Sequence, residues 1–277
     1  MRRASIGLRL ALGLALVGAE SVSASDYWDV ATNNDNSFFL TRNELVHGTS
    51  QQHDLEANGG LEGIVSDQDW YIAISYPTGS YEAVIDGTGG DITPFVGLDR
   101  IASDGTTVLQ TSGEANPAAG GGFSRRLAWQ YTTTSGVPAK EYLRVQSGGC
   151  TTDCAPKDQY RIRFRETTVS VPRFNNALGQ LTVLIIQNST GWNSNSPISG
   201  TVYFWSTAGA LLGSQTFSLI GRAALVLNTA NVAGVAGKSG TITVAHDGGY
   251  GNLAVKSVAL EPTTGFSFDT PGLYKPQ

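Results

Sequence analysis

Beyond its first two dozen residues, the chain is a series of short β-rich runs separated by turn clusters, with no convincing amphipathic helix beyond a turn near residues 40–45. The clearest run is Tyr160–Glu166, in which Tyr160, Ile162 and Phe164 alternate with three arginines. A period of two residues is the pattern of a β-strand with one buried face. We therefore expect a sheet with one face in a core and the arginines on its solvated face; an anion site is the alternative for these arginines.

The strand-like runs fall into two sets. The first ends at Glu166, and the second begins with the continuous apolar run 181–187, which favours a central strand covered on both faces. A connection rich in β-branched residues, 167–172, separates the sets. Six or seven runs per set is typical of an antiparallel sandwich. The sequence therefore predicts an all-β protein with two tandem antiparallel β-sandwich domains, residues 25–168 and 172–277; one large barrel is the alternative.

Residues 1–24 predict a cleaved signal peptide. Arg2 and Arg3 precede an apolar run over residues 10–19, which is too short to span the hydrocarbon core of a membrane as a helix. Small residues before Ser25 supply a cleavage site. We expect a secreted protein, periplasmic or extracellular, with no transmembrane segment in the mature chain; an N-terminal anchor helix is the alternative.

The two cysteines, Cys150 and Cys154, lie close together in a segment rich in Gly, Thr and Asp. In an oxidising compartment they are expected to form a structural disulfide across a tight loop. Three residues separate them, whereas a redox motif has two, and two thiols without a nearby histidine do not make a zinc site.

Composition and motifs exclude several functions. Charged residues are only 15% of the chain, the net charge is −5, and no stripe of Lys or Arg supplies the footprint of a nucleic-acid partner. The chain has no G-x-S-x-G motif. Its carboxylates mostly lie beside glycines or at strand edges, as turn residues do, rather than as a glycosidase pair. We predict a non-catalytic protein without an organic cofactor; a hydrolase with an unrecognised site is an alternative.

The first set contains several short motifs that together form one pattern. They are Asn33-Asn34-Asp35, His53-Asp54-Leu55, Asp67-x-Asp69-Trp70-Tyr71, Tyr81-Glu82, the hairpin segment 100–106 and Tyr160-Arg161-Ile162. Over residues 28–166 this pattern resembles the bacterial pre-peptidase C-terminal (PPC) domain, a secreted β-sandwich commonly appended to extracellular proteases. Thr93-Pro94-Phe95 departs from the Asp-Leu-Tyr-like element of that family. The resemblance implies a module that assists secretion, substrate contact or surface attachment.

Calcium is the metal that the first set suggests. Asp and Asn oxygens on loops suit Ca²⁺, and some PPC-like domains carry such a site near the N-terminal segment. By position, the expected ligands are Asp29, Asn34, Asp35, Asp67 and Asp69. The alternative is that these are ordinary turn residues, since no EF-hand loop is present.

Two aromatic residues lie in polar loops, Trp192 and Tyr250. An aromatic ring among Asn, Ser and Gly residues could stack on a sugar or anchor a protein partner; alternatively, each ring folds back over the end of a sandwich. Trp70, Trp129 and Trp205 lie in apolar or alternating runs and are expected in the core. We predict an exported accessory or binding protein that contacts a carbohydrate polymer or an envelope or extracellular protein, with a cell-surface assembly component as the alternative.

Overall fold

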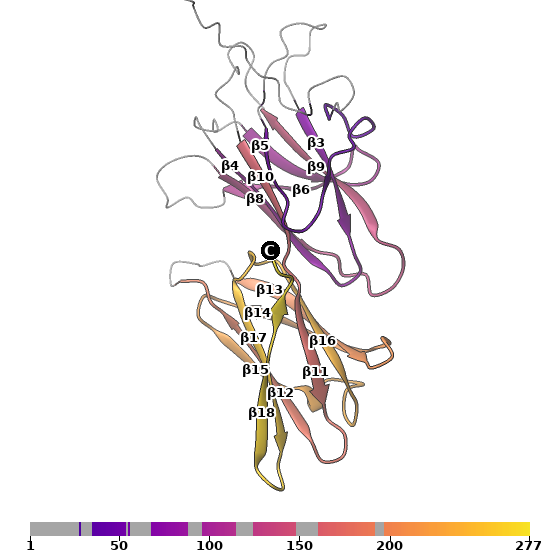
Figure 1. Ribbon diagram of the computed structural model, residues 1–277, viewed down its shortest axis with the longest axis vertical. Helices are drawn as coiled ribbons and strands as arrows, with labels where there is room; N and C mark the ends of the chain where they lie inside the picture. Colours follow the sequence, from indigo (N-terminus) through magenta and orange to yellow (C-terminus); the bar gives the residue numbers. More distant parts are fainter. Residues whose placement is uncertain are drawn as a thin grey trace, which may run out of the picture.

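The computed structural model describes residues 28, 35–53, 55, 68–87, 96–114, 124–147, 160–191 and 197–277. Strands dominate this part of the chain, and its only helical element is the short 3-10 turn η1 (Thr229–Asn231). Four sheets stack as two layered pairs along the long axis of the molecule (Figure 1). The predicted all-β sandwich fold is confirmed.

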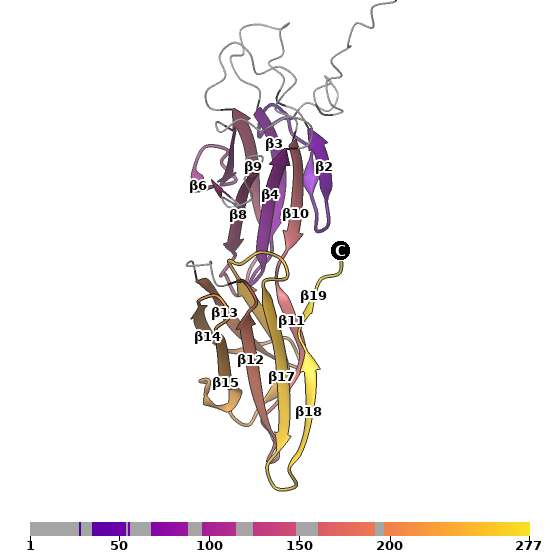
Figure 2. The same ribbon diagram turned by 90° about the vertical axis from the view of Figure 1, so that its left-hand side faces the viewer.

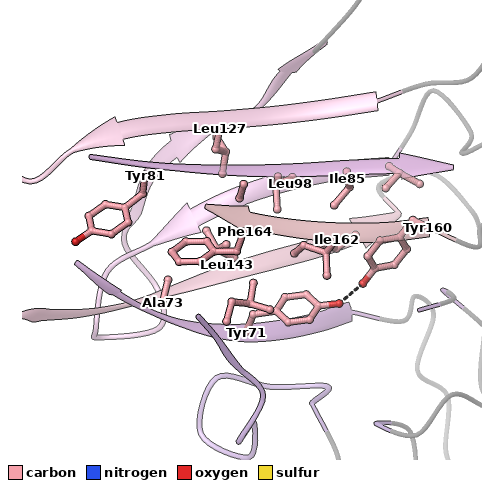
Figure 3. Packing of buried hydrophobic residues seen from close by; sticks show 14 of the residues in the cluster. Tyr71, Ala73, Tyr81, Ile85, Leu98, Leu127, Leu143, Tyr160, Ile162 and Phe164 are labelled. Carbon is pink, nitrogen blue, oxygen red and sulfur yellow. Dashed lines mark hydrogen bonds between the residues drawn. The ribbon is translucent and has the colours of Figure 1, made fainter. Parts of the chain in front are cut away.

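Two five-stranded sheets form the first sandwich. Sheet A contains, in spatial order, β1 (Glu44–Leu45), β3 (Gln68–Ser75), β9 (Ala139–Ser147), β5 (Val96–Ile101) and β6 (Val108–Thr111). Sheet B contains β2 (Ser50–His53), β10 (Tyr160–Glu166), β4 (Ser80–Gly87), β8 (Ser124–Gln130) and β7 (Gly113–Glu114). β1 runs parallel to β3, whereas the other strand pairs described here are antiparallel. Their inner faces enclose one apolar core, seen in Figure 3.

Two further sheets form the second sandwich. Sheet C contains, in spatial order, β14 (Leu211–Leu219), β13 (Ile198–Ser206), β16 (Ser239–His246), β11 (Val169–Asn175) and β19 (Leu273–Tyr274). Sheet D contains β15 (Ala224–Asn228), β12 (Leu181–Asn188), β17 (Leu253–Glu261) and β18 (Phe266–Pro271). All these pairs are antiparallel, and they enclose a separate apolar core.

The alternation in β10 has the predicted consequence. Tyr160, Ile162 and Phe164 are buried in the core of the first sandwich. On the opposite face, Arg161 is exposed and Arg163 forms an ion pair with Asp86 on the neighbouring strand β4. Arg161 and Arg163 therefore occupy the outer face of sheet B, as expected, whereas Arg165 is partly buried over the Tyr250 ring.

Two local predictions for the second half are wrong. Residues 169–172 of the segment expected to connect the two sets are the first four residues of strand β11, and Val169 and Val171 are buried in the second core. A register shift between Val171 and Phe174 accommodates Pro172, which has no N–H for the ladder. In β12, only one face is buried; Val183 and Ile185 lie half-exposed on the other, because one face of sheet D packs against sheet C.

The two sandwiches are joined by only two residues, Thr167 and Thr168, which are both buried. The backbone N–H of Thr167 donates to the Ser80 carbonyl oxygen (2.8 Å), and its hydroxyl donates to the Ser80 hydroxyl (2.9 Å). The Ser80 N–H in turn donates to the Thr168 hydroxyl (2.9 Å). The link is therefore hydrogen-bonded to Ser80, the first residue of β4 in sheet B.

Candidate metal centre

Three side chains from separate segments meet at the end of the first sandwich that lies farthest from the second. His53 is the last residue of β2 and pairs in register with Tyr160, the first residue of β10. Asp69 is the second residue of β3. Asp35 precedes β1, and its carbonyl oxygen accepts a hydrogen bond from the Trp70 N–H (2.9 Å), which holds Asp35 beside the start of β3. The centre therefore joins sheet A, sheet B and the segment before β1.

The geometry of this centre suits a metal ion. One ligand atom from each of Asp35, His53 and Asp69 lies within 4.8 Å of the others. The three residues are 0%, 1% and 1% exposed. A carboxylate, an imidazole and a second carboxylate that converge in this way can supply three ligands to one cation.

Two tyrosines hold the centre in place. The Tyr160 hydroxyl donates a hydrogen bond to Asp69 Oδ2 and lies 2.5 Å from the Tyr71 hydroxyl (Figure 3). Burial, followed by the nearby Asp69 carboxylate, raises the pKa of Tyr160 well above its usual value, so the phenol keeps its proton. The His53 ring stacks on Tyr160, with centroids 5.6 Å apart, and meets the Tyr71 ring edge-on at 5.1 Å. The ligands are thus fixed by their neighbours.

Asn43 is a further polar residue on this side of the core. It is 1% exposed, and neither amide atom of its side chain has a hydrogen-bond partner in the described part of the chain. Its carbonyl oxygen accepts from the Ile72 N–H (2.8 Å) in the parallel β1–β3 ladder. This register places Asn43 beside Tyr71. Asn43 and Leu45 are both buried and Glu44 between them is exposed, so Asn43 shares the interior face with Leu45.

The structure brings together two of the five residues expected to bind calcium, Asp35 and Asp69. Asp29, Asn34 and Asp67 lie outside the described residues. Sequence reasoning did not identify His53 as a ligand, because the pairing of β2 with β10 that turns its ring toward Asp69 is a long-range contact. The one available signal was the position of His53 at the end of a polar run that is followed by Asp54 and Leu55.

Other expected site residues are placed as follows. Trp192, Cys150 and Cys154 lie outside the described residues, so the binding role and the disulfide stay predictions. Tyr250 is half-buried between the sandwiches: its N–H donates to Glu82 (3.1 Å) and its hydroxyl donates to the Lys275 carbonyl oxygen (2.7 Å). Its binding role also stays a prediction.

Of the three tryptophans expected in the core, two are buried and one is not. Trp70 and Trp129 are buried, as expected. Trp205 is half-buried outside the second core, and its indole N–H donates to the Thr243 hydroxyl (3.1 Å). It follows Phe204, which is buried in that core, so the alternation of β13 turns the Trp205 ring to the outer face of sheet C.

The described part of the chain contains no helix with the length and hydrophobicity of a transmembrane span.

Comparison with known proteins gives no family. No family model matches the chain, and no curated protein matches it. Among solved structures, a β-glucuronidase from glycoside hydrolase family 2 aligns over 87% of this chain and 26% of its own, with 11% identity and a TM-score of 0.19. A Bacteroides uniformis β-glucuronidase aligns over 83% of this chain and 32% of its own (10% identity, TM-score 0.21). The extracellular region of zebrafish Gpr126/Adgrg6 aligns over 82% and 30% (9% identity, TM-score 0.20). This chain thus spans about a third or less of each, and similarity at this level carries no argument about function.

Proposed function

We propose that this chain is an exported, non-catalytic binding protein in which two sandwiches act as one rigid support. The observation that carries the proposal is the polar junction between them. Glu82 of β4 accepts a hydrogen bond from Arg126 Nε (2.6 Å) and, through its other oxygen, from the Tyr250 N–H of the second sandwich (3.1 Å). Arg126 also donates to the Asp247 carbonyl oxygen (3.2 Å). A buried carboxylate shared in this way resists bending at the junction, because bending would leave a desolvated charge without partners.

The C-terminal tail adds a second fastening. It continues from β19 and ends beside the molecule at the level of the junction, as Figure 2 shows. The Lys275 ammonium lies 3.2 Å from a Glu166 carboxylate oxygen, and His47 Nε2 lies 3.0 Å from the Pro276 carbonyl oxygen. The Glu166 N–H donates to His47 Nδ1 (2.9 Å), so that imidazole bridges the tail and the end of β10. Contacts on two sides of the link support a fixed, elongated arrangement.

Several buried charged side chains of the first sandwich are paired with one another, which supports a non-catalytic role. Arg100 pairs with Glu141 (2.6 Å), and Arg144 pairs with Asp99 (2.7 Å). These carboxylates stabilise the fold and are not presented to a substrate. The cavity beside the tail has a volume of about 120 Å³, well below the roughly 300–1,000 Å³ of pockets that enclose a small organic ligand. This cavity is therefore too small to enclose such a ligand.

The second sandwich offers a surface for a weakly charged partner. Residues 174–221 contain no Asp, Glu, Lys, Arg or His, and they include the strands β12, β13 and β14. On β13 and β14 the side chains that reach the surface include Ser199, Thr201, Ser214, Gln215 and Thr216. Such hydroxyl and amide groups suit a neutral polysaccharide or an uncharged protein surface. Trp192, in the same stretch, would supply the stacking ring. The PPC-like resemblance of residues 28–166 belongs to the same proposal, since it implies an accessory module.

One experiment addresses binding and catalysis together. The mature chain is incubated with insoluble neutral and anionic polysaccharides and with cell-wall preparations, and both retained protein and released sugar are measured. We expect retention on a neutral polymer without release of sugar, and loss of retention in Trp192→Ala with an unchanged melting temperature. Release of sugar would contradict the non-catalytic role. Equal retention of wild type and variant would show that Trp192 does not contribute to binding.

A second candidate, a cell-surface assembly component, is favoured by the edge strand β14. This nine-residue strand closes sheet C, contains no charged residue or proline, and exposes Ser214, Gln215 and Thr216. Long edge strands without such protection can pair with a strand of another chain. Light scattering on the same preparation discriminates: a monomer at all concentrations supports the binding protein, and a growing polymer supports assembly.

A further inference from the structure

We infer that Asp35, His53 and Asp69 form a binding site for one divalent transition-metal ion, of the Zn²⁺ class, that ties the segment before β1 to both sheets of the first sandwich. The inference does not depend on the proposed binding function. It rests on the donor types, their burial and convergence, and the groups around them.

The donor set selects the class of metal. Ca²⁺ takes six to eight oxygen ligands and has no preference for imidazole. Zn²⁺ and its first-row neighbours take imidazole nitrogen together with carboxylate oxygen, often with three protein ligands and one open position. The convergence of His53 with Asp35 and Asp69 within 4.8 Å fits this second pattern. The calcium expected from sequence is therefore replaced by a transition metal in this proposal.

Electrostatics favours a cation at this position. Asp35 and Asp69 are 0% and 1% exposed, and two ionised carboxylates at this separation repel each other in a medium of low dielectric constant. A divalent ion between them would remove this repulsion. A neutral imidazole is the appropriate third ligand, because its lone pair is available to the metal without adding charge.

The surrounding groups supply an independent pointer. Neither amide atom of Asn43 has a hydrogen-bond partner in the described chain, although the residue is 1% exposed, and a buried amide without partners is costly. Asn43 faces the interior beside Tyr71, on the same face as Asp69. An amide without partners on this face is available to a group held beside it, such as a metal-bound water. Tyr160 donates to Asp69, which is the kind of contact that orients a metal-binding carboxylate.

The metal would cross-link three segments of the chain. Asp35 stands before β1, His53 ends β2 of sheet B, and Asp69 lies in β3 of sheet A. A single ion would thus close two loops of the chain. It would also connect the two sheets at the end of the first sandwich that lies farthest from the second. Binding free energy at such a site adds to folding free energy, because the unfolded chain does not offer the same geometry.

The first test uses the tag-free mature chain after treatment with a chelator. We expect calorimetry to give one Zn²⁺ bound per chain, with an affinity at least 100-fold above that for Ca²⁺, and the addition of Zn²⁺ to raise the melting temperature. Co²⁺, used as a spectroscopic probe, should give a saturable visible absorption band at the same stoichiometry. Absence of saturable Zn²⁺ binding would overturn the site, and a preference for Ca²⁺ would overturn the class of metal.

Variants locate the site. His53→Gln and Asp35→Asn should each weaken Zn²⁺ binding by more than tenfold and alter the Co²⁺ band. His47→Gln, which removes an imidazole at the opposite end of the same sandwich, is the matched control and should leave both unchanged. If His53→Gln fails to fold, Asp35→Asn and the Co²⁺ spectrum of the wild type still decide. Unchanged affinity in Asp35→Asn, or equal loss in the His47 control, would contradict the assignment.

Discussion

The two sandwiches share an architecture but bury different kinds of polar group. The first encloses charges in pairs, such as Arg100 with Glu141 and Arg126 with Glu82, and it carries the Asp–His–Asp centre. The second buries hydroxyl and amide groups, such as Thr182 and Asn188, together with the imidazole of His246. The difference follows from composition, since residues 174–221 contain no charged side chain. The stability of the first sandwich should therefore depend on charge pairing and metal, and that of the second on apolar packing and on the buried imidazole of His246.

The largest effect should come from breaking a buried pair in the first sandwich. Glu141 accepts two hydrogen bonds from Arg100 (2.8 and 2.6 Å) and one from the Ser75 hydroxyl (3.0 Å). Glu141→Ala leaves the Arg100 charge buried, over the Trp129 ring, without its partner. We expect a loss of about 3–5 kcal/mol in the free energy of unfolding, measured by urea denaturation.

Replacing both members of that pair sharpens the test. A double variant with apolar residues of similar volume at positions 100 and 141 should recover much of the loss, because no uncompensated charge remains. A loss below about 1 kcal/mol in Glu141→Ala would show that the pair is effectively solvated, and the contrast between the sandwiches would weaken.

Acid should destabilise the second sandwich through His246. Burial, with a smaller contribution from the nearby Arg126 charge, lowers the pKa of His246 from 6.5 to about 4. Below pH 6.5 the unfolded chain binds a proton at this residue and the folded chain does not, so stability falls as the pH drops from 6.5 to 4. The shift corresponds to about 3 kcal/mol lost across that window.

The measurement is the free energy of unfolding against pH for the wild type and for His246→Gln. The variant lacks the titrating group, so the difference between the two curves should shrink steadily from pH 6.5 to pH 4. Parallel curves across this window would mean that His246 is protonated equally in the folded and unfolded states, contrary to the expectation.

The smallest effect should come from the ion pair on the outer face of the second sandwich. Lys256 and Asp269 lie 2.8 Å apart on paired strands, and their side chains are 47% and 56% exposed. Asp269→Asn should cost no more than about 1 kcal/mol, and less at high salt, because water screens exposed pairs. A cost similar to that of Glu141→Ala would show that exposure does not explain the difference between the two pairs.

Local periodicity predicted the faces of several strands before any contact was known. The alternation of Tyr160, Ile162 and Phe164 with arginines indicated which side of β10 is buried, because side chains point to opposite faces every second residue. The same reasoning missed β11, since Pro172 and β-branched residues read equally well as a connection. It overstated the burial of β12, since an apolar run does not reveal whether a second layer covers its outer face.

The sequence by itself determined that the chain is all-β and which polar residues are available near the start of β3. Only the tertiary structure decided that Asp35 and Asp69 meet His53, because that meeting depends on the pairing of β2 with β10 and of β1 with β3. It also decided that Tyr250 lies against Glu82 at the junction, although 168 positions separate the two in the chain. Strand formation depends on neighbouring residues, whereas a site depends on contacts between segments whose spacing in sequence carries no geometric signal.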